Sequence, residues 1–417
     1  MSHINKKVPK RRFQEFNNTD DWEQRKLLEH IEKVLDFRGK SPTKFGMEWL
    51  DKGYLVLSAL NVKAGYIDKS VEAKFGSQEL FDKWMGEQRL RKGDVVFTTE
   101  APLGNVAQIP DNNGYILNQR AVAFKTSPDI MDNDFLAQFL RSPFFQHKLN
   151  MNASGGTAKG IGMKEFAKLS SYLPKDVKEQ KKIGSLLKTI DNIIALHQRK
   201  LEKIKALKTA YLSEMFPAEG ETKPKRRFGG FTDDWEQRKF SQVADIFDGT
   251  HQTPKYTDFG VKFVSVENIA TMETKKYISQ EAYDKEYSNK KVEQGDVLMT
   301  RIGDVGTAKV IETDEPLAYY VTLALLKPKG IDPDFLAQQI ASPEVQRSIW
   351  KRTLHIAFPK KINLGEINQV SIFIPDLEEQ AEIGIFFKKL DKTITLHQCK
   401  LKKLQNIKKA YLNEMFI

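Results

Sequence analysis

The chain has 417 residues, of which 40% are hydrophobic and 29% charged, so it is long enough for two or more domains with sizeable cores. It carries 66 Lys and Arg against 55 Asp and Glu, and this formal charge of +11 favours a polyanionic partner. A single cysteine, Cys399, excludes an internal disulfide and a cysteine-rich zinc site and indicates a reducing cytoplasm, and no apolar run is long enough to cross a membrane.

Residues 1–18 are rich in Lys and Arg and are predicted to form a basic, poorly ordered N-terminal arm. The letters TDDWEQRK follow at Thr19–Lys26 and recur unchanged at Thr232–Lys239. An Arg-Arg-Phe triplet precedes both copies. These repeats indicate that the chain contains an internal duplication.

Short apolar and β-branched runs predict strands in both copies. Gly93–Thr99 matches Gly295–Arg301, and each reads as a turn that feeds a strand. A second short run follows each of them after a glycine, as in a hairpin. Ala121–Phe124 and Val321–Leu326 are predicted as central strands.

A helical pattern follows the strands in both copies. Asp134–Gln138 repeats at Asp334–Gln338, and each predicted helix is broken by a Ser-Pro pair. Beyond this point the copies differ, since Ser154–Gly160 is rich in glycine where the second copy has His355–Lys361. A short strand then leads each copy to a proline and a long helix.

The long helices are predicted over residues 175–216 and 375–417, which share many identical letters. Apolar residues recur at steps of four and three, which predicts a narrow seam between two paired helices. In the first copy they are Ile183, Leu187, Ile190, Ile194, Leu201 and Ile204. His197 and His397 interrupt the seam at equivalent steps, either as polar residues that set the register or as a metal-binding or pH-sensing pair.

The chain is therefore a mixed region followed by a long helix, written twice. The mixed regions are predicted at residues 19–174 and 228–374, and residues 217–227 are predicted to be the linker between the halves. The fold class is α+β with a pseudo-two-fold internal repeat.

The sequence lacks the common catalytic motifs. It has no Gly-x-x-x-x-Gly-Lys-Ser/Thr loop, no dinucleotide glycine fingerprint, and no histidines at metal-ligand spacing. We therefore expect no catalytic residue, metal or cofactor. Asp68, Glu72 and Lys74 weakly resemble a nuclease set, so a stand-alone nuclease or modifying enzyme with a site in the mixed regions is the alternative.

The ordered, duplicated set of elements resembles the specificity (S) subunit of type I restriction-modification enzymes, over about Thr19–Phe416. Its most specific part is a proline followed by Glu-Gln-x-x-Ile and an aspartate, at Pro174–Asp191 and again at Pro375–Asp391. The resemblance implies two target recognition domains separated by two long antiparallel helices, which form an intramolecular coiled coil.

The resemblance also implies a non-catalytic, cytoplasmic subunit that recognises a bipartite, asymmetric target in double-stranded DNA. Two modification (methyltransferase) subunits would dock on the helices, and ATP-dependent restriction subunits would join the full complex. The apolar positions expected to dock these partners are Leu186, Ile193, Ile385 and Phe386. The alternative is that these side chains only widen the seam within the chain.

Residue type and loop position select the candidate DNA contacts, because Lys and Arg bind phosphates while Arg, Asn, Gln and Lys read base edges. In the first mixed region they are Asn118, Gln119, Arg120, Ser154, Thr157 and Lys159, and in the second Arg301, Lys360 and Lys361. The alternative for each is an ordinary surface or turn role. Because the loop at 355–361 departs from the Ser-Gly-Gly-Thr pattern, contacts of the first loop need not carry over.

Overall fold

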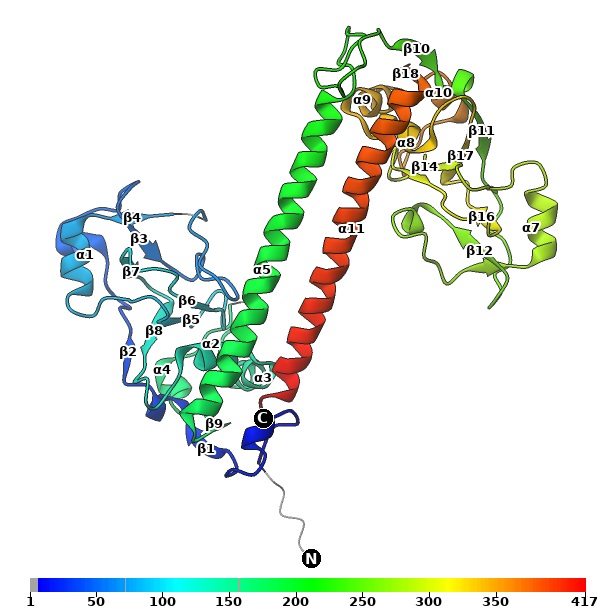
Figure 1. The fold of residues 1–417 in the computed structure, drawn as a ribbon. Coiled ribbons are helices and arrows are strands. Elements are labelled where there is room, and N and C mark those ends of the chain that lie inside the picture. The colour runs from blue at the N-terminus through cyan, green and yellow to red at the C-terminus, as the bar shows by residue number, and fades with distance from the viewer. Residues whose placement is uncertain (1–6, 72, 157) are drawn as a thin grey trace, which may run out of the picture. The chain divides into compact units, whose positions relative to one another are not determined.

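The computed structural model describes residues 7–71, 73–156 and 158–417 (Figure 1). Its contacts divide the chain into two compact units: unit 1 contains the chain up to Gln198 together with Cys399–Ile417, and unit 2 contains Arg199–Gln398. The long helices α5 (Val177–Glu214) and α11 (Leu377–Glu414) each begin in one unit and end in the other. Unit 2 is therefore one continuous stretch of the chain, whereas unit 1 is built from two separate segments.

Unit 1 contains a four-stranded antiparallel sheet and a smaller three-stranded sheet. The four-stranded sheet has the order β2 (Lys33–Leu35), β8 (Ala121–Lys125), β5 (Val95–Thr98) and β6 (Val106–Gln108). The smaller sheet has the order β4 (Phe75–Gly76), β3 (Tyr54–Leu57) and β7 (Tyr115–Leu117). The predicted hairpin of β5 with β6 and the central position of β8 are confirmed, whereas the parallel pairing of β3 with β7 was not predicted.

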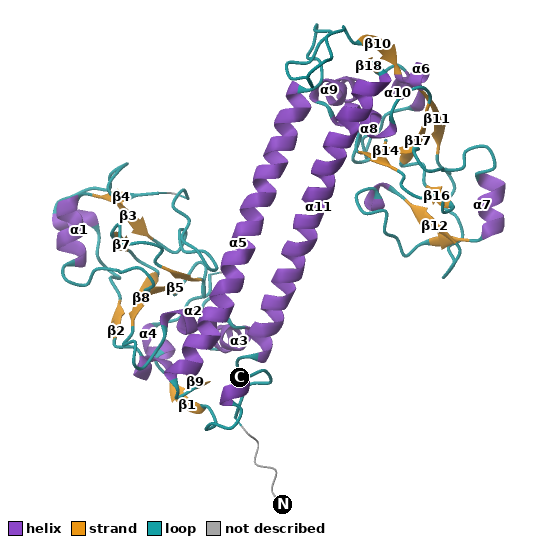
Figure 2. Cartoon of the chain, in the orientation of Figure 1, coloured by secondary structure: helices purple, strands orange, loops and turns teal. Residues whose placement is uncertain are grey.

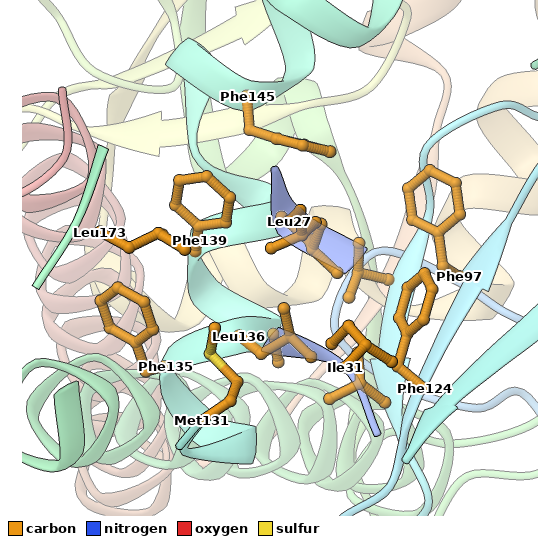
Figure 3. Packing of buried hydrophobic residues seen from close by; sticks show 14 of the residues in the cluster. Leu27, Ile31, Phe97, Phe124, Met131, Phe135, Leu136, Phe139, Phe145 and Leu173 are labelled. Atoms are coloured by element: carbon orange, nitrogen blue, oxygen red, sulfur yellow. The ribbon is translucent and has the colours of Figure 1, made fainter. Parts of the chain in front are cut away.

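Strand β5 is buried on both faces, which explains its unbroken apolar run. Phe97 packs into the core that lies against the helices, while Val96 packs into the core of the smaller sheet. Figure 3 shows Phe97 and Phe124 from the sheet facing the phenylalanines of the helical layer. The helices around these cores are α1 (Gln78–Met85), α2 (Asn133–Arg141), α3 (Pro143–Met151) and α4 (Met163–Phe166).

The predicted break at the Ser-Pro pair is confirmed in unit 1. The Asp132 side chain caps α2 by accepting a hydrogen bond from the Phe135 amide. Helix α2 ends at Arg141, and the Ser142 hydroxyl then accepts from the Phe145 amide to cap α3, which has Pro143 at its first turn.

Inside unit 1, the beginning of α5 lies antiparallel to the end of α11. Ile183 and Leu187 share a core with Met415 and Phe416. Further along α5, the Asp191 carboxylate binds the Lys408 ammonium of α11. Unit 1 also contains an antiparallel pair of strands, β1 (Glu23–Lys26) and β9 (Ser170–Leu173), and β9 ends shortly before α5 begins.

The prediction of a poorly ordered arm is wrong for residues 7–18, which are held by the rest of unit 1. The Arg12 guanidinium forms a two-pronged ion pair with Glu179, at 2.7 and 2.8 Å, and both side chains are buried. The Arg11 amide donates to the Glu414 carbonyl at 2.9 Å. Two of the basic residues that suggested an arm in solvent, Arg11 and Arg12, instead have carboxylate partners on the long helices.

Unit 2 repeats this plan with its own short strands and helices (Figure 2). Its four-stranded antiparallel sheet has the order β11 (Ala244–Asp248), β17 (Leu323–Pro328), β14 (Val297–Thr300) and β15 (Ala308–Val310). Its other strand groups are β13 (Tyr277–Ile278), β12 (Val261–Val264) and β16 (Leu317–Tyr319), and the pair β10 (Glu236–Lys239) and β18 (Ser371–Ile374). The helices are α6 (Phe240–Val243), α7 (Gln280–Glu286), α8 (Pro333–Ala341), α9 (Pro343–Arg352) and α10 (Leu364–Asn368).

Short 3₁₀ helices complete the two units: Gln14–Phe16, Leu27–His30 and Pro42–Phe45 in unit 1, and Val266–Asn268 in unit 2. Among the described residues, no helix combines the length and the hydropathy needed to cross a bilayer.

Inside unit 2, the end of α5 lies antiparallel to the beginning of α11. The Phe387 ring lies 5.9 Å from that of Phe216, and further along the pair Asp391 binds the Lys208 ammonium at 2.6 Å. These contacts mirror the Asp191 and Lys408 pair of unit 1. His197 and His397 are both half-buried on their helices, and their proposed roles stay predictions.

Candidate nucleic-acid interface

In unit 1 the end of strand β5 joins the two segments from which the candidate DNA contacts were chosen. The Thr99 amide donates to the Arg120 carbonyl at 2.9 Å, and the Thr99 carbonyl accepts from the Ile161 amide at 2.9 Å. The turn at 118–120 and the loop at 154–160 therefore meet at one residue. The two candidate segments are far apart in sequence, and their hydrogen bonds to Thr99 bring them together.

The turn presents two exposed side chains and one that is half-buried. Asn118 is the half-buried one, and its amide donates to the Leu57 carbonyl at 2.9 Å. Gln119 is exposed, and so is Arg120, which has a left-handed φ of 64°. The Arg120 guanidinium lies 3.7 Å from the Glu100 carboxylate, an exposed pair whose mutual attraction is weak. This arginine can therefore exchange its carboxylate for a phosphate at little cost.

The loop of unit 1 is a closed, glycine-dependent turn. Ser154 and Gly160 exchange two backbone hydrogen bonds of 2.9 Å. Gly155 has a φ of +106°, and a Cβ at this position would lie 2.4 Å from the Ala158 carbonyl oxygen, so only glycine fits. Ser154 and Lys159 are exposed, while Thr157 lies outside the described residues.

Unit 2 uses the same backbone scaffold at the end of strand β14. The Arg301 amide donates to the Thr322 carbonyl and the Arg301 carbonyl accepts from the Ile362 amide, both at 2.9 Å. Arg301 thus occupies the place that Thr99 has in unit 1. The duplication extends to the hydrogen bonds that hold the candidate site.

Arg301 is 6% exposed, and its side chain has partners within unit 2. Its Nη1 donates to Asp248 Oδ1 at 2.6 Å and to the Val321 carbonyl at 3.0 Å, and its Nε donates to the Ile362 carbonyl at 3.3 Å. A direct base contact by Arg301 stays a prediction. These bonds give it a positioning role, because one guanidinium ties the strand end to β11 and to the following loop.

The other two candidates of unit 2 lie on the loop at 354–361. Its ends are joined by a 2.7 Å hydrogen bond from the Leu354 amide to the Lys361 carbonyl, and the Lys360 carbonyl accepts from the Gly303 amide at 2.8 Å. Lys360 and Lys361 are exposed. The loop thus carries its two lysines beside the strand end that Arg301 organises.

Sequence reasoning missed two polar residues of this site. Asp248, at the end of β11, binds Arg301 on one side and His251 Nε2 on the other, the latter at 2.7 Å. Neither residue belongs to a motif, and both lie far from Arg301 in sequence. No strand was predicted at residues 244–248, and the pairing of β11 with β17 that positions Asp248 is seen only in the structure.

The proposed docking residues of the helices fall into two groups. Leu186 is half-buried against the core of unit 1, and Phe386 packs against Tyr211 in unit 2, with ring centroids 5.1 Å apart. Ile193 and Ile385 are 37% and 53% exposed. The first two therefore take part in internal packing, and the last two offer apolar surface for a partner.

The structure describes only part of the Asp68, Glu72 and Lys74 set on which the stand-alone enzyme alternative rests. Asp68 accepts a 2.7 Å hydrogen bond from the Ser70 hydroxyl, and Glu72 lies outside the described residues. Within the described ranges, no three His, Cys, Asp or Glu side chains form a cluster that could hold a metal ion.

Comparison with known proteins assigns the family. The model of the type I restriction modification DNA specificity domain matches residues 19–206 and again residues 232–406. The type I restriction enzyme MjaVIII specificity subunit of Methanocaldococcus jannaschii is 24% identical over 416 residues, covering 94% of this chain and 92% of that protein. The EcoBI specificity subunit of Escherichia coli is 23% identical over 292 residues, 64% of this chain and 60% of that protein.

The fold also has a solved counterpart. The crystal structure of the type I restriction-modification system S subunit from M. genitalium matches with a TM-score of 0.69 at 14% identity, covering 98% of this chain and 99% of that chain. The predicted fold class, two mixed α/β domains with long helices, is thereby confirmed at the level of the fold, while the coiled-coil detail stays a prediction. Since the family model covers both repeats, the chain belongs to the type I restriction-modification DNA specificity family, whose role is DNA recognition.

Proposed function

We propose that this chain is the non-catalytic cytoplasmic subunit that selects the DNA target of a type I restriction-modification complex, and that its target is bipartite and asymmetric. Residues 19–174 and 228–374 are the two target recognition domains in this proposal, each reading one half-site of double-stranded DNA. The observation that carries it is the duplicated strand-end scaffold at Thr99 and Arg301, with the same backbone bonds and different side chains around them.

The difference between the scaffolds supports an asymmetric target. In unit 1 the scaffold presents Gln119 and Arg120 on a tight turn, whereas in unit 2 it presents Lys360 and Lys361 on a loop. Base edges in the major groove differ in their donors and acceptors, so different side chains on one scaffold favour different bases. Exposed Lys and Arg on both scaffolds supply the phosphate contacts that dominate affinity.

Two modification subunits dock on the long helices in this proposal, and the restriction subunits join through the complete complex. Ile193 and Ile385 supply exposed apolar contacts, and Leu186 and Phe386 add the parts of their side chains that the unit cores leave uncovered. Helices α5 and α11 are each 38 residues long without interruption, which suits a spacer between half-sites. Methyl transfer and ATP-driven restriction belong to the partner subunits.

The test is to express the chain with its modification subunit and to map methylated bases across the host genome. We expect one motif with two specified parts and an unspecified gap. Arg120→Ala should relax the motif in one part only, and Lys361→Ala in the other. A continuous motif, or DNA cleavage or methylation by the purified chain alone, would contradict the proposal and favour the stand-alone enzyme.

A further inference from the structure

The loop at 354–361 of unit 2 carries two large apolar side chains that are fully in solvent. Ile356 is 99% exposed and Phe358 is 103% exposed. Single exposed apolar residues are common on protein surfaces, but two at one loop tip indicate a contact surface.

The base of this loop is held in place by backbone bonds and ring contacts. Its ends pair through Leu354 and Lys361, and Lys361 also forms a bridge with Ile302, directly after the strand end. The Trp350 ring lies 4.0 Å from the His355 ring and 4.6 Å from the Lys360 ammonium. A fixed base lowers the entropy that the tip loses when it enters a partner.

The loop and the helix end that leads into it are basic. Residues 350–361 contain no Asp or Glu, and their cationic residues are Lys351, Arg352, Lys360 and Lys361. A fully exposed apolar tip between cations is the arrangement by which proteins push side chains between base pairs while they bind the neighbouring phosphates.

Unit 1 has the same loop framework with a different tip. The bridges of Ser154 and Glu100 with Gly160 match those of Leu354 and Ile302 with Lys361. In the described part of the first tip the residues are Gly155, Gly156, Ala158 and Lys159, which are small or polar. The framework is shared, and only the tip of unit 2 carries large apolar side chains among the described residues.

We propose that the loop at 354–361 acts as a wedge, in which Phe358, supported by Ile356, inserts between adjacent base pairs of the half-site read by unit 2. Unit 1 reads its half-site without such insertion. This inference rests on the proposed function of unit 2 as a reader of one half-site. It adds a deformability requirement, because base steps that unstack easily are favoured at the point of insertion.

Duplex DNA is favoured over an anionic membrane or a partner subunit as the occupant. The loop pairs with the residues directly after the strand end at Arg301 and contains two candidate DNA contacts, Lys360 and Lys361. Its framework also repeats that of the unit 1 loop, which carries the candidates Ser154 and Lys159. A wedge at this place meets DNA whenever those lysines meet phosphate.

The experiment uses the complex of the full chain with its modification subunit and duplexes that carry the methylation-mapped target. The fluorescent base 2-aminopurine replaces one base at a time in the second half-site, except at the methylated base, which the methyltransferase itself unstacks. With the wild-type complex we expect a several-fold rise in fluorescence at one step. Phe358→Ala should abolish the rise and weaken binding about tenfold, the range of aromatic contacts with bases.

Phe259→Ala is the matched control, because Phe259 is 84% exposed in the same unit but lies outside the loop. It should leave both fluorescence and affinity unchanged. A target that is bound and methylated without any fluorescence rise would overturn the wedge and leave the proposed function standing. Absence of any bipartite target would overturn both.

Two further measurements separate the other occupants. Sedimentation with phosphatidylglycerol vesicles tests a membrane surface, and co-purification with the modification subunit tests a protein contact. A loss in either one upon Phe358→Ala, with unchanged DNA binding, would refute the wedge. Because Phe358 is fully exposed, the variant should unfold at the wild-type temperature, which thermal unfolding verifies.

Discussion

Replacing Lys408 by methionine should stabilise unit 1 at neutral pH. The Lys408 side chain is 9% exposed and its ammonium binds Asp191, a carboxylate that also accepts from Arg141 Nη1 and Gln138 Nε2, each at 2.8 Å. Burial, with the nearby charge of Arg141, lowers the pKa of Lys408 to about 8. The ammonium is therefore less well solvated here than in the unfolded chain, even with its ion pair.

The magnitude follows from the difference between about 8 and the ordinary 10.5. At about 1.4 kcal/mol per pKa unit, keeping Lys408 charged costs the folded state roughly 3 kcal/mol relative to the unfolded chain. Between about pH 8 and 10.5 the unfolded chain binds more protons, so the free energy of unfolding should rise across this window. Lys408→Met should remove that rise and add about 1–3 kcal/mol at pH 7, since the lost pair with Asp191 offsets part of the gain.

The assay is proteolysis in increasing urea at pH 7 to 10, read by mass spectrometry so that peptides of unit 1 are separated from those of unit 2. The control is Lys208→Met, since Lys208 binds Asp391 in unit 2 with side chains 20% and 40% exposed. This more exposed pair should change stability by less than about 1 kcal/mol. A lower urea midpoint for unit 1 in Lys408→Met at pH 7, or a wild-type midpoint that does not rise with pH, would refute the reasoning.

Three other substitutions test the packing and the site. Gly184→Ala should lower the melting temperature, because the added Cβ would lie 2.4 Å from a backbone nitrogen of α2. The expected cost of this clash, about 1–3 kcal/mol, exceeds the gain of about 1 kcal/mol in helix propensity. The control Gly365→Ala should not lower the melting temperature, because its Cβ would have nothing within 4 Å. Glu179→Gln should cost unit 1 about 3–5 kcal/mol in urea unfolding, because it leaves Arg12 buried without its carboxylate, and a loss below about 1 kcal/mol would contradict this. Arg301→Ala should relax only the second half-site in gel-shift competition, and unchanged sequence choice would rule out both a direct and a positioning role.

The sequence predicted the parts of the fold that depend on local pattern. The β5 and β6 hairpin follows from a repeated Gly-Asp-Val run, and the break between α2 and α3 follows from Ser142 and Pro143. The length of α5 follows from the regular steps of its apolar residues. Each of these depends on residues that are close in sequence, where propensity and capping decide the outcome.

The parts that sequence could not predict depend on distant partners. Arg301 was selected as a DNA contact by residue type and loop position, but the structure shows its side chain bonded to Asp248 and the Val321 carbonyl inside unit 2. Residues 7–18 were predicted to be poorly ordered because the segment is rich in Lys and Arg. The carboxylates that bind Arg12 and Arg11, Glu179 and Glu414, lie far along the chain. A cluster of like charges predicts an exposed segment as long as its distant ion-pair partners are unknown.

The exchange of helix ends between the units has a consequence for biosynthesis. Unit 1 includes residues 399–417, which the ribosome makes only after all of unit 2. Until residues 399–417 are made, Ile183 and Leu187 lack their neighbours Met415 and Phe416. Unit 1 is therefore translated first but completes its core last. A nonsense codon near residue 400 should therefore damage the N-terminal reader while leaving most of the C-terminal one intact.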